Sequence, residues 1–415
     1  MKRTCRISGK GLTPIFDLGN LYVTGYYPDI SLDAPRGNLQ LGIGEESGLV
    51  QLCHTVDRDI LYREYWYRSG TNVTMARQLK EITDQVPYWV RLNDGDIVLD
   101  IGCNDGTLLK HYPKLPKLFK VGIDPARNIA EEGRVHCDVH STKYFTKKTF
   151  FNLTDGRKAK VITAIAMFYD LDDPGSFVSD VVDSLTDDGI FIIQLSYTPL
   201  MIQQNAFDNI IHEHLEFFTL VSLKYLFDKY DLKIVDVQLN DVNAGSFRII
   251  ATKKDNNLDD AAIFNKDIGQ YRLNSFLMNE KKHGMSKLET FEKFMRRVEK
   301  QKIILMDILY NLRNEGKKVF GYGASSKGNT LLQYYGITPD LLTAIAERQP
   351  QKYGLFTAGS WIPIISEEEM RSAQPDYLLV FPWHFIHEFV YREKEFLSKG
   401  GKFITPLPEV KIIGA

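Results

Sequence analysis

The sequence has few cysteines and no long hydrophobic run. Both features limit the cellular compartments in which the protein is expected. The four cysteines, at positions 5, 53, 103 and 137 of 415, do not have the spacing of a disulfide framework. No run of eighteen apolar residues is present, which excludes an obvious membrane-spanning helix. The basic N-terminus, MKRTCRISGK, is not followed by an apolar block, so we expect no secretory signal. These features predict a protein of the reducing cytoplasm.

The chain also lacks an excess of charge of either sign. Lys and Arg together number 51 and Asp and Glu 53, which gives a net charge of −2. This balance argues against a partner held by bulk electrostatics, such as duplex nucleic acid or an anionic membrane. The length exceeds what one hydrophobic core supports, so two or three domains are expected.

Four regions follow from the composition. Residues 1–70 are rich in Gly, Pro and Asp and predict a small, loop-rich N-terminal domain. Residues 71–255 alternate strand-like and helical segments, which predicts an α/β domain with a mostly parallel sheet. Residues 256–315 are polar and predict a helical connector that ends in one long amphipathic helix. Residues 316–415 resume the alternation and predict a second, smaller α/β domain with about five strands.

The strands expected in the larger domain are apolar and β-branched. DIVLDIG, FKVGID, KVITAIAMF and GIFIIQLS read as strands that are buried on both faces of a sheet. DPGSFVSDVVDSL, between the last two, reads as a crossover helix. LKIVDVQLND and SFRIIATKK, joined by a short turn, predict an antiparallel hairpin at the edge of the sheet.

A glycine loop in VLDIGCNDGTLLK follows the first of these strands. The spacing G-x-x-x-G differs from the G-x-G-x-x-G of dinucleotide sites, and Asp100 and Asp105 make the loop acidic. Such a loop favours a ligand that bears a cation over a pyrophosphate. Asp124, at the end of the next strand, is placed to accept the two hydroxyls of a ribose. An adenosine with a positive centre and no phosphate describes S-adenosylmethionine, although a structural turn that binds nothing is the alternative.

The stretch NIIHEHLEFF places two histidines around a glutamate within an apolar run. Three interpretations are open for His212, Glu213 and His214: a metal site, a catalytic base with a partner, or polar groups satisfied within a core. A metal site would need a third ligand, and the sequence offers no matching one. A histidine base suits proton removal near neutral pH.

A second glycine loop, VFGYGASSKGNT, carries Ser325, Ser326 and Lys327 at the start of a helix. Free backbone N–H groups, hydroxyls and a lysine favour a phosphate, although the spacing is not that of a Walker loop. A structural turn in an accessory domain is the alternative. Tyr322 is a candidate for stacking on a nucleobase, or for packing only. Two such sites in facing domains would bring their ligands together in the cleft between them.

The sequence resembles the S-adenosylmethionine-dependent sugar C-methyltransferases that act on nucleotide-linked 4-keto-deoxysugars. The resemblance rests on seven motifs in the same order over nearly the whole chain: YWYRSGTNVTM, VLDIGCNDGTLL, IHEHLEFF, DVNAGSFRI, GYGASSKGNTLLQYYGI, AERQPQKYGLFTAGSWIPIIS and PDYLLVFPWHFIHE. It implies an α/β fold with a class I methyltransferase Rossmann-like domain, a smaller Rossmann-like C-terminal domain that holds the nucleotide, and a zinc-ribbon-like N-terminal domain.

One implied feature is largely missing. The family's N-terminal domain carries two Cys-x-x-Cys pairs that bind a structural zinc, whereas here only Cys5 remains and Ser8, Gly44 and Ser47 stand at the other three positions. One thiolate does not hold a structural zinc, so we expect zinc to be absent.

The resemblance also assigns roles in the reaction. It places the base that removes a proton next to the ketone on His214, with Glu213 orienting or polarising and His212 either structural or lining the site. A tyrosine of the EYWYRSG segment takes part, and Tyr65 and Tyr67 are both candidates. The family tyrosine that precedes His-Glu-His is Ile211 here, which puts the transfer of a specific mechanism in doubt. Donors to the enolate are sought in Tyr67, Asn243 and the backbone around Ser246.

The expected site residues fall into three groups. The catalytic group is His214, Glu213, Tyr65 and Tyr67. The cofactor group is Asp100, Gly102, Asn104, Asp105, Gly106, Thr107, Leu108, Asp124 and Pro125. The substrate group is Asn243, Ser246, Gly321, Tyr322, Gly323, Ser325, Lys327, Glu347 and Lys352.

The sequence therefore predicts a cytoplasmic methyltransferase that methylates a carbon, C3, of a nucleotide-linked keto-deoxysugar. The expected partner is this sugar substrate, with no nucleic acid and no membrane, and the chain is expected to be a monomer or a homodimer. Two alternatives remain open: a nucleotide-sugar-binding homologue without turnover, and an O- or N-methyltransferase that acts on a related sugar.

Overall fold

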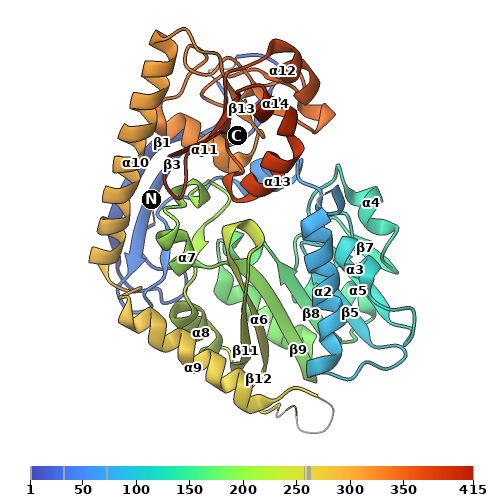
Figure 1. The fold of residues 1–415 in the computed structure, drawn as a ribbon. Coiled ribbons are helices and arrows are strands. Elements are labelled where there is room, and N and C mark those ends of the chain that lie inside the picture. Colours follow the sequence, from blue (N-terminus) through green and yellow to red (C-terminus); the bar gives the residue numbers. More distant parts are fainter. Residues whose placement is uncertain (1, 31–32, 72, 257, 259–262, 415) are drawn as a thin grey trace.

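The protein is built around three main β-sheets, which the computed structural model shows for residues 2–30, 33–71, 73–256, 258 and 263–414 (Figure 1). A four-stranded sheet lies in the N-terminal lobe, a seven-stranded sheet in the centre and a six-stranded sheet in the C-terminal lobe. A two-stranded pair, β2 (Tyr26–Tyr27) with β15 (Phe356–Thr357), joins the first lobe to the last.

The N-terminal sheet takes its last strand from far along the chain. β1 (Leu12–Tyr22), β3 (Arg36–Gly44) and β4 (Val50–Leu52) pair antiparallel, and β10 (Glu216–Phe217) adds to β4. β10 comes directly after the His-Glu-His segment. The segment is therefore fixed by backbone hydrogen bonds to the N-terminal lobe.

Two turns of the N-terminal lobe have the same backbone pattern. In each, the first residue donates to the carbonyl of the fifth residue on and accepts from the N–H of the fourth: Cys5 with Lys10 and Gly9, and Gly44 with Leu49 and Gly48. The Cys5 thiol and the Ser47 hydroxyl lie 3.1 Å apart, and a Cβ at Gly44 would lie 2.8 Å from both. Three of the four positions that correspond to zinc ligands thus converge and pack against each other, while the Ser8 hydroxyl accepts from the Lys10 N–H.

The central sheet has the order β11-β12-β9-β8-β5-β6-β7. The five strands from β9 to β7 run parallel, and β12 is inserted antiparallel between β9 and β11, so the predicted hairpin is confirmed. This arrangement is the class I methyltransferase type of sheet that was expected. The strands are β5 (Ile97–Ile101), β6 (Phe119–Ile123), β7 (Val139–Ser141), β8 (Ala159–Ile165), β9 (Leu185–Ser196), β11 (Leu232–Asn240) and β12 (Ser246–Lys253).

Helices cover both faces of the central sheet. On one face, apolar residues of α2 (Val73–Trp89) and α3 (Thr107–His111) pack on the strands. On the other face, the core includes residues of α5 (Lys147–Thr154), α6 (Pro174–Ser184) and α8 (Leu220–Asp228). Because both faces are covered, the strands carry the continuous apolar runs that identified them in the sequence. The remaining short helices of this region are α1 (Arg58–Tyr62), α4 (Ala130–Arg134) and α7 (Thr198–Gln203).

The predicted connector consists of two helices, α9 (Lys266–Lys282) and α10 (Leu288–Asn314), which are separated at Gly284. The long helix was expected from residue 288 onward and is confirmed as α10. Its buried face joins the core shared by the N- and C-terminal lobes, and Figure 1 shows it running beside β1. No helix in the described ranges combines the length and apolar character needed to cross a bilayer.

The C-terminal sheet has the order β16-β14-β13-β17-β18-β19. Its first five strands are parallel, as expected, and β19 adds an antiparallel edge strand that the sequence did not indicate. The strands are β13 (Val319–Tyr322), β14 (Ile345–Glu347), β16 (Ile364–Ser366), β17 (Tyr377–Val380), β18 (Lys402–Thr405) and β19 (Lys411–Ile413). The helices are α11 (Ser326–Tyr335), α12 (Glu367–Ala373), α13 (Ile386–Arg392) and α14 (Lys394–Ser398).

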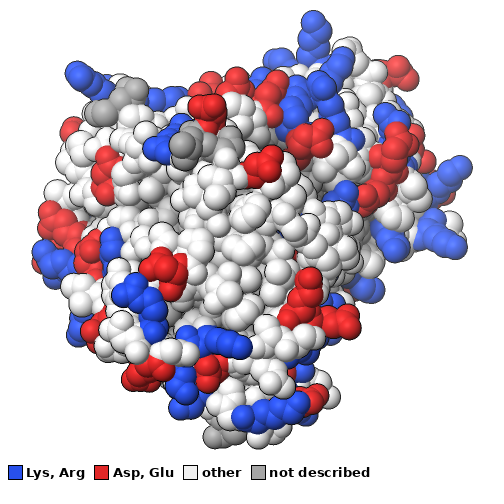
Figure 2. Space-filling model, turned by 90° about the horizontal axis from the view of Figure 1, so that it is seen from above, with Lys and Arg blue, Asp and Glu red and all other residues white. Residues whose placement is uncertain are grey.

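Charges of both signs are mixed on the surface seen in Figure 2. Basic and acidic side chains alternate around the rim of this face, and neutral residues fill its middle. This face carries no extended patch of one sign, in agreement with the balanced composition.

Phe294 tests the packing of α10. Its side chain is 1% exposed in the shared core, so Phe294→Ala should destabilise the protein by about 3–5 kcal/mol through lost contacts and a cavity. Ile303→Ala on the same helix, at a residue 68% exposed, should change stability by less than about 0.5 kcal/mol. Denaturant unfolding followed by circular dichroism measures both. Equal effects would show that α10 does not pack this way in solution.

Candidate active site

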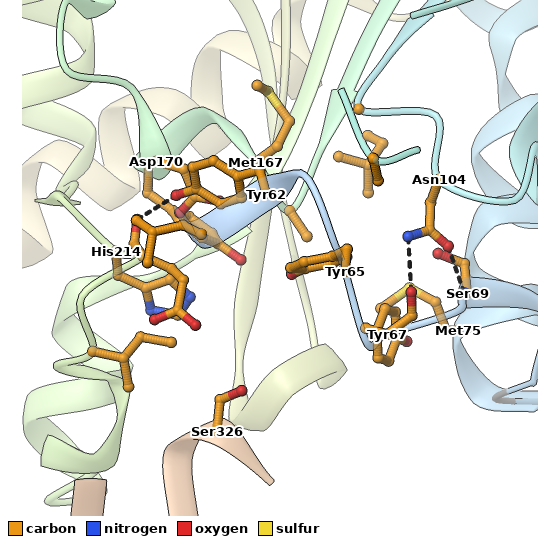
Figure 3. A pocket seen from close by; sticks show the side chains of 18 of the residues that line it. Tyr62, Tyr65, Tyr67, Ser69, Met75, Asn104, Met167, Asp170, His214 and Ser326 are labelled. Carbon is orange, nitrogen blue, oxygen red and sulfur yellow. Dashed lines mark hydrogen bonds between the residues drawn. The ribbon is translucent and has the colours of Figure 1, made fainter. Parts of the chain in front are cut away.

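One cleft of about 1160 Å³ is lined by residues of both α/β lobes. The central lobe contributes the first glycine loop, the ends of β6 and β8, and the residues Ile211, Glu213, His214 and Leu215. The C-terminal lobe contributes the second glycine loop, the end of β14 and the segment that leads into α13. A strap, residues 55–75, closes one wall and carries Tyr62, Tyr65 and Tyr67 (Figure 3). The volume is larger than that of an ordinary single-ligand pocket.

The first glycine loop holds the strap in place. Gly102 has φ +72°, and a Cβ there would lie 3.0 Å from Cγ of Met167, so glycine is needed for both conformation and space. Asn104 donates from Nδ2 to the Tyr67 carbonyl at 3.0 Å and accepts from the Ser69 N–H at 2.9 Å (Figure 3). The loop therefore fixes where the strap tyrosines stand.

Three residues that were expected to bind the cofactor instead make contacts that stabilise the first glycine loop. Asp105 accepts from the Gly70 N–H at 2.7 Å and from the Thr107 hydroxyl at 2.5 Å. Gly106, with φ +76°, precedes α3 and packs against Gly133. None of Asp105, Gly106 and Thr107 is among the residues that line the cleft, whereas Leu108 and Pro125 are.

Two buried carboxyls face the first lobe of the cleft. Asp100 accepts from the Thr163 hydroxyl at 2.6 Å, and burial raises its pKa to about 7. Asp124 accepts from the backbone N–H groups of Asn104 and Ala126, each at 2.8 Å, and burial raises its pKa as well. A cation placed beside these groups would favour their charged forms.

His212 and His214 point to different partners. Nε2 of His212 lies 2.9 Å from the Gly37 carbonyl oxygen, which anchors the segment to β3, and His212 does not line the cleft. Nδ1 of His214 lies 2.8 Å from the Asn209 carbonyl oxygen. The two imidazoles thus do not form a metal pair, and in the described ranges no group of three His, Cys, Asp or Glu is placed to hold a metal ion.

The hydrogen bond of His214 fixes its tautomer. A carbonyl oxygen only accepts, so Nδ1 carries the proton and Nε2 keeps a lone pair. His214 lines the cleft, and its Nε2 has no hydrogen-bond partner in the part of the chain that the structure describes. Burial, and then the Lys327 ammonium, lower the pKa of His214 to about 3. The imidazole is therefore neutral and free to accept a proton from a bound molecule.

Glu213 faces the cleft beside His214 but contacts the N-terminal lobe. Its Oε1 accepts from the Thr24 hydroxyl at 2.7 Å, and its Oε2 is buried with no partner among the described atoms. Burial raises the pKa of this carboxyl. Its backbone carbonyl accepts from the Tyr62 hydroxyl at 3.1 Å. Glu213 is thus held by Thr24 and does not bond to His214.

Tyr65 and Tyr67 both line the cleft, at different places. Figure 3 shows Tyr65 between His214 and the glycine loop, and Tyr67 beside Asn104. Burial raises the pKa of Tyr67 to about 12 and raises that of Tyr65 further. The Tyr65 hydroxyl has no hydrogen-bond partner among the described residues, so it remains available to a ligand. Ile211 lines the same wall and presents no hydroxyl.

Ser246, which was expected at the substrate, lies elsewhere. Ser246 is 2% exposed and donates its hydroxyl to the Val242 carbonyl at 2.9 Å, outside the cleft lining. Asn243 belongs to the turn η4 (Val242–Ala244), and its side chain lies outside the described part of the chain.

The second glycine loop aims a lysine at the cleft. Ser325 caps α11 by accepting from the Gly328 N–H at 3.0 Å, and Gly323 has φ +85°. Lys327, in the first turn of α11, lines the cleft, and burial lowers its pKa against the opposing effect of Asp208. No described residue accepts a hydrogen bond from its ammonium. This loop thus offers a helix start and an unpaired cation.

Of the other substrate residues expected around this loop, some line the cleft and others do not. Tyr322 is 1% exposed and donates to Glu393 at 2.8 Å, so its ring packs in the core and is not free to stack. Glu347 lines the cleft and accepts from the Arg348 N–H at 2.7 Å. Lys352 donates to the Ala324 carbonyl at 2.8 Å, behind the loop. Gly321 and Lys352 do not line the cleft.

Several cleft residues were missed in the sequence. They follow the end of β8, lie just before α13 or, for the last one, belong to α13: Met167, Tyr169, Asp170, His384, Phe385 and Arg392. Met167 to Asp170 come directly after β8, where the carboxyl ends of parallel strands meet, so topology offered a signal for them. PWHFIHE was recognised as a motif, but nothing in it showed which residue faces the cleft.

Comparisons with known proteins agree on the type of chemistry. Residues 72–237 match a methyltransferase domain model, and residues 241–408 match a model described as C-methyltransferase C-terminal domain. The chain is 30% identical over 369 residues to the C-methyltransferase NovU of Streptomyces niveus, which covers 88% of this chain and 85% of NovU.

Solved structures align with less than half of the chain. The plantazolicin methyltransferase BpumL, in complex with SAH, is 13% identical over 45% of this chain and 87% of its own, with a TM-score of 0.35. An S-adenosylmethionine-dependent methyltransferase from Clostridium acetobutylicum is 13% identical over 43% of this chain and 91% of its own, with a TM-score of 0.32. Matches at these TM-scores say nothing about what this chain binds.

The charge state of His214 is open to measurement. We expect its imidazole to stay neutral from pH 5 to pH 8, because burial and Lys327 lower its pKa to about 3. Lys327→Met should raise this pKa by removing a cation, whereas Lys224→Met, at an exposed lysine paired with Asp228, should leave it unchanged. NMR of labelled histidine, assigned with a His214→Gln variant, follows the titration. A midpoint near 6.5 in the parent protein would contradict the burial of this ring.

Proposed function

This chain belongs to the C-methyltransferase family, and on that premise we propose that it transfers the methyl group of S-adenosylmethionine to C3 of a nucleotide-linked keto-deoxysugar. The observation that carries the proposal is the Nδ1 hydrogen bond of His214 at 2.8 Å, which leaves Nε2 as a base in a cleft shared by both glycine loops. Proton removal from a carbon next to a ketone is what methylation at that carbon requires.

The first lobe of the cleft suits the cofactor. Asp124 ends β6 with a carboxyl that can accept ribose hydroxyls, and Asp100 is a second buried carboxyl nearby. Gly102 leaves backbone open to close approach. When bound, the cofactor supplies an electrophilic methyl group on a sulfonium. Its positive charges would favour the ionised forms of these two acids.

The second lobe suits the nucleotide of the sugar. The ammonium of Lys327 and the start of α11 offer a cation and unpaired N–H groups, the combination that binds phosphate oxygens. Phe385 and Arg392 of the same lobe also line the cleft. A diphosphate bound here would leave the sugar pointing toward His214.

Lys327 would make the pKa of His214 depend on whether the substrate is bound. Its ammonium lowers the pKa of His214, and phosphate oxygens beside it would cancel that effect. The imidazole would then become a stronger base only when a nucleotide is present. His214 takes the proton at Nε2, while Asn209 holds Nδ1 and so supports the imidazolium that forms.

A protein that binds nucleotide sugars without turnover is the second candidate, and Ile211 favours it. The side chain at this position lines the cleft without a hydroxyl that could assist an enolate. Methyl transfer to oxygen or nitrogen is the third candidate, and it would not need His214 to remove a carbon-bound proton.

One assay separates these candidates. Incubation with labelled S-adenosylmethionine and a panel of nucleotide-linked 4-keto sugars should give a labelled sugar with the new methyl group on carbon. With S-adenosylhomocysteine in place of the donor, the sugar should exchange its α-hydrogen with D2O. His214→Ala should reduce both rates by on the order of 10²–10⁴-fold, the usual contribution of a general base. Label transfer without exchange would point to O- or N-methylation, and retained sugar without label to a binding protein.

Cofactor affinity should depend on pH through Asp100. Because its pKa is raised to about 7, the carboxyl is half protonated near neutrality and must lose this proton to meet a cation. The affinity for S-adenosylmethionine should therefore weaken as pH falls below 7, by up to about tenfold per unit, and level off above it. Asp100→Asn should flatten this slope, whereas Asp187→Asn, at a carboxylate 94% exposed, should keep it. Isothermal titration calorimetry from pH 5.5 to 8 measures it, and an unchanged slope in Asp100→Asn would contradict this assignment.

A further inference from the structure

Asp170 is a carboxyl of the cleft that no expected role covers. It ends the turn η2 (Phe168–Asp170), directly after β8, and lines the same wall as His214. Its Oδ1 is buried with no hydrogen-bond partner, and no described residue donates to its Oδ2. Figure 3 shows Asp170 beside Tyr62 and on the same side of the cleft as His214. The preceding residue, Tyr169, packs its ring edge-on against His214 at 4.4 Å between centroids.

The surroundings of Asp170 favour the protonated acid. The nearby charges are carboxyls, Glu213 and Glu216, and Arg6 lies against Glu216, 3.4 Å away. Burial, and then these carboxyls, hold the pKa of Asp170 well above its usual range. The titratable groups that face it from the packed elements are Glu213, Glu216, Tyr62, Tyr65 and Tyr169. A buried carboxylate oxygen without donors is costly, whereas the neutral acid needs only one acceptor.

The proposed chemistry needs a hydrogen-bond donor to the carbonyl oxygen of the substrate, and no residue on this wall has yet been assigned that role. A ketone that loses an α-proton develops negative charge on oxygen, which needs a donor. The Tyr62 hydroxyl already donates to the Glu213 carbonyl, and Ile211 has no donor. Tyr67 lies beside Asn104, across the cleft from His214 (Figure 3). Tyr65 has a free hydroxyl, but a carboxylic acid is the stronger proton donor.

We propose, building on the function above, that Asp170 is the catalytic acid of this site and donates its proton to the substrate's carbonyl oxygen while His214 removes the proton from the adjacent carbon. The C–H bond breaks, its proton goes to Nε2 of His214, and its electron pair forms the C=C bond of an enol whose O–H proton comes from Asp170. The enol carbon then forms the bond to the methyl group as the C–S bond breaks and sulfur takes the electron pair. The O–H proton returns to Asp170, and the net proton leaves from His214.

The proposed roles account for the presence of two neighbouring carboxyls, Asp170 and Glu213, in one wall. Asp170 and Glu213 face one cleft within electrostatic reach, so ionising both is unfavourable. Glu213, with Thr24 as a donor, is the better placed of the two to carry a negative charge. Asp170 has no such donor and keeps the proton.

Asp170→Asn tests the proposal because the amide keeps the shape and an N–H donor but has no acidic proton to transfer. Methyl transfer and hydrogen exchange in D2O should both fall by on the order of 10²–10³-fold in kcat, with KM for the sugar and the affinity for S-adenosylmethionine within about threefold of the parent. The exchange rate of the parent should fall on the alkaline side, as the acid loses its proton, and this limb should be absent in Asp170→Asn. Asp183→Asn, an exposed carboxylate on α6 paired with Lys147, is the matched control.

The outcomes are separable. Asp170→Asn with parent-like exchange, or with lost methyl transfer but intact exchange, overturns the acid role and leaves the proposed function standing. A parent protein that catalyses neither exchange nor transfer on any keto sugar overturns both. Asp170→Ser, checked by thermal unfolding beside Asp170→Asn, guards against a folding defect, since a catalytic acid predicts the same loss of exchange in whichever variant folds.

Discussion

The hydrogen bond from Nδ1–H of His214 to the carbonyl of Asn209, 2.8 Å long, is the constraint from which the chemistry of the cleft follows. It leaves a single lone pair, on Nε2, as the basic position of the ring, and it holds the ring against rotation. The backbone that supplies this carbonyl is itself fixed. The segment continues into β10, which pairs with β4, and His212 binds the Gly37 carbonyl at 2.9 Å. The N-terminal lobe therefore positions the base through β4 and the Gly37 carbonyl.

Burial shifts the pKa of titratable groups on both walls of the cleft. The central lobe presents Asp100, Asp124, Asp170 and Glu213, all with a pKa raised by burial, and the C-terminal lobe presents Lys327 with a lowered pKa. Burial thus makes the charged form of each of these groups more costly. A cation in the first lobe and an anion beside Lys327 would lower this cost, so these buried groups favour the two ligands of the proposed reaction.

Most of the fold could be predicted from the sequence because its signals are local. Continuous apolar runs, glycine loops and the long stripe of α10 each depend on a few neighbouring residues, and they gave the sheets and the connector. The two histidines have different surroundings, since His212 binds the Gly37 carbonyl outside the cleft lining and His214 lines the cleft. What could not be predicted depends on contacts between distant segments. The pairing of β10 with β4, the bond of Asp105 to the Gly70 N–H and the burial of Tyr322 are tertiary features with no local signature.

Asp170 illustrates why site prediction fails where fold prediction succeeds. In the sequence it is one of three acids in YDLDDP, and its neighbour Asp172 has an ordinary environment with a side chain 56% exposed and an ion pair to Lys2 at 2.9 Å. Asp170 has no donor among the described residues, and Glu213 and Glu216 of β10 are the carboxyls that act on it after the chain turns at the end of β8. Residue type and spacing cannot report such a loss of partners. Burying an acid without a donor destabilises the fold. In the same wall as the fixed imidazole of His214, however, the acid keeps its proton and can donate it in the proposed reaction.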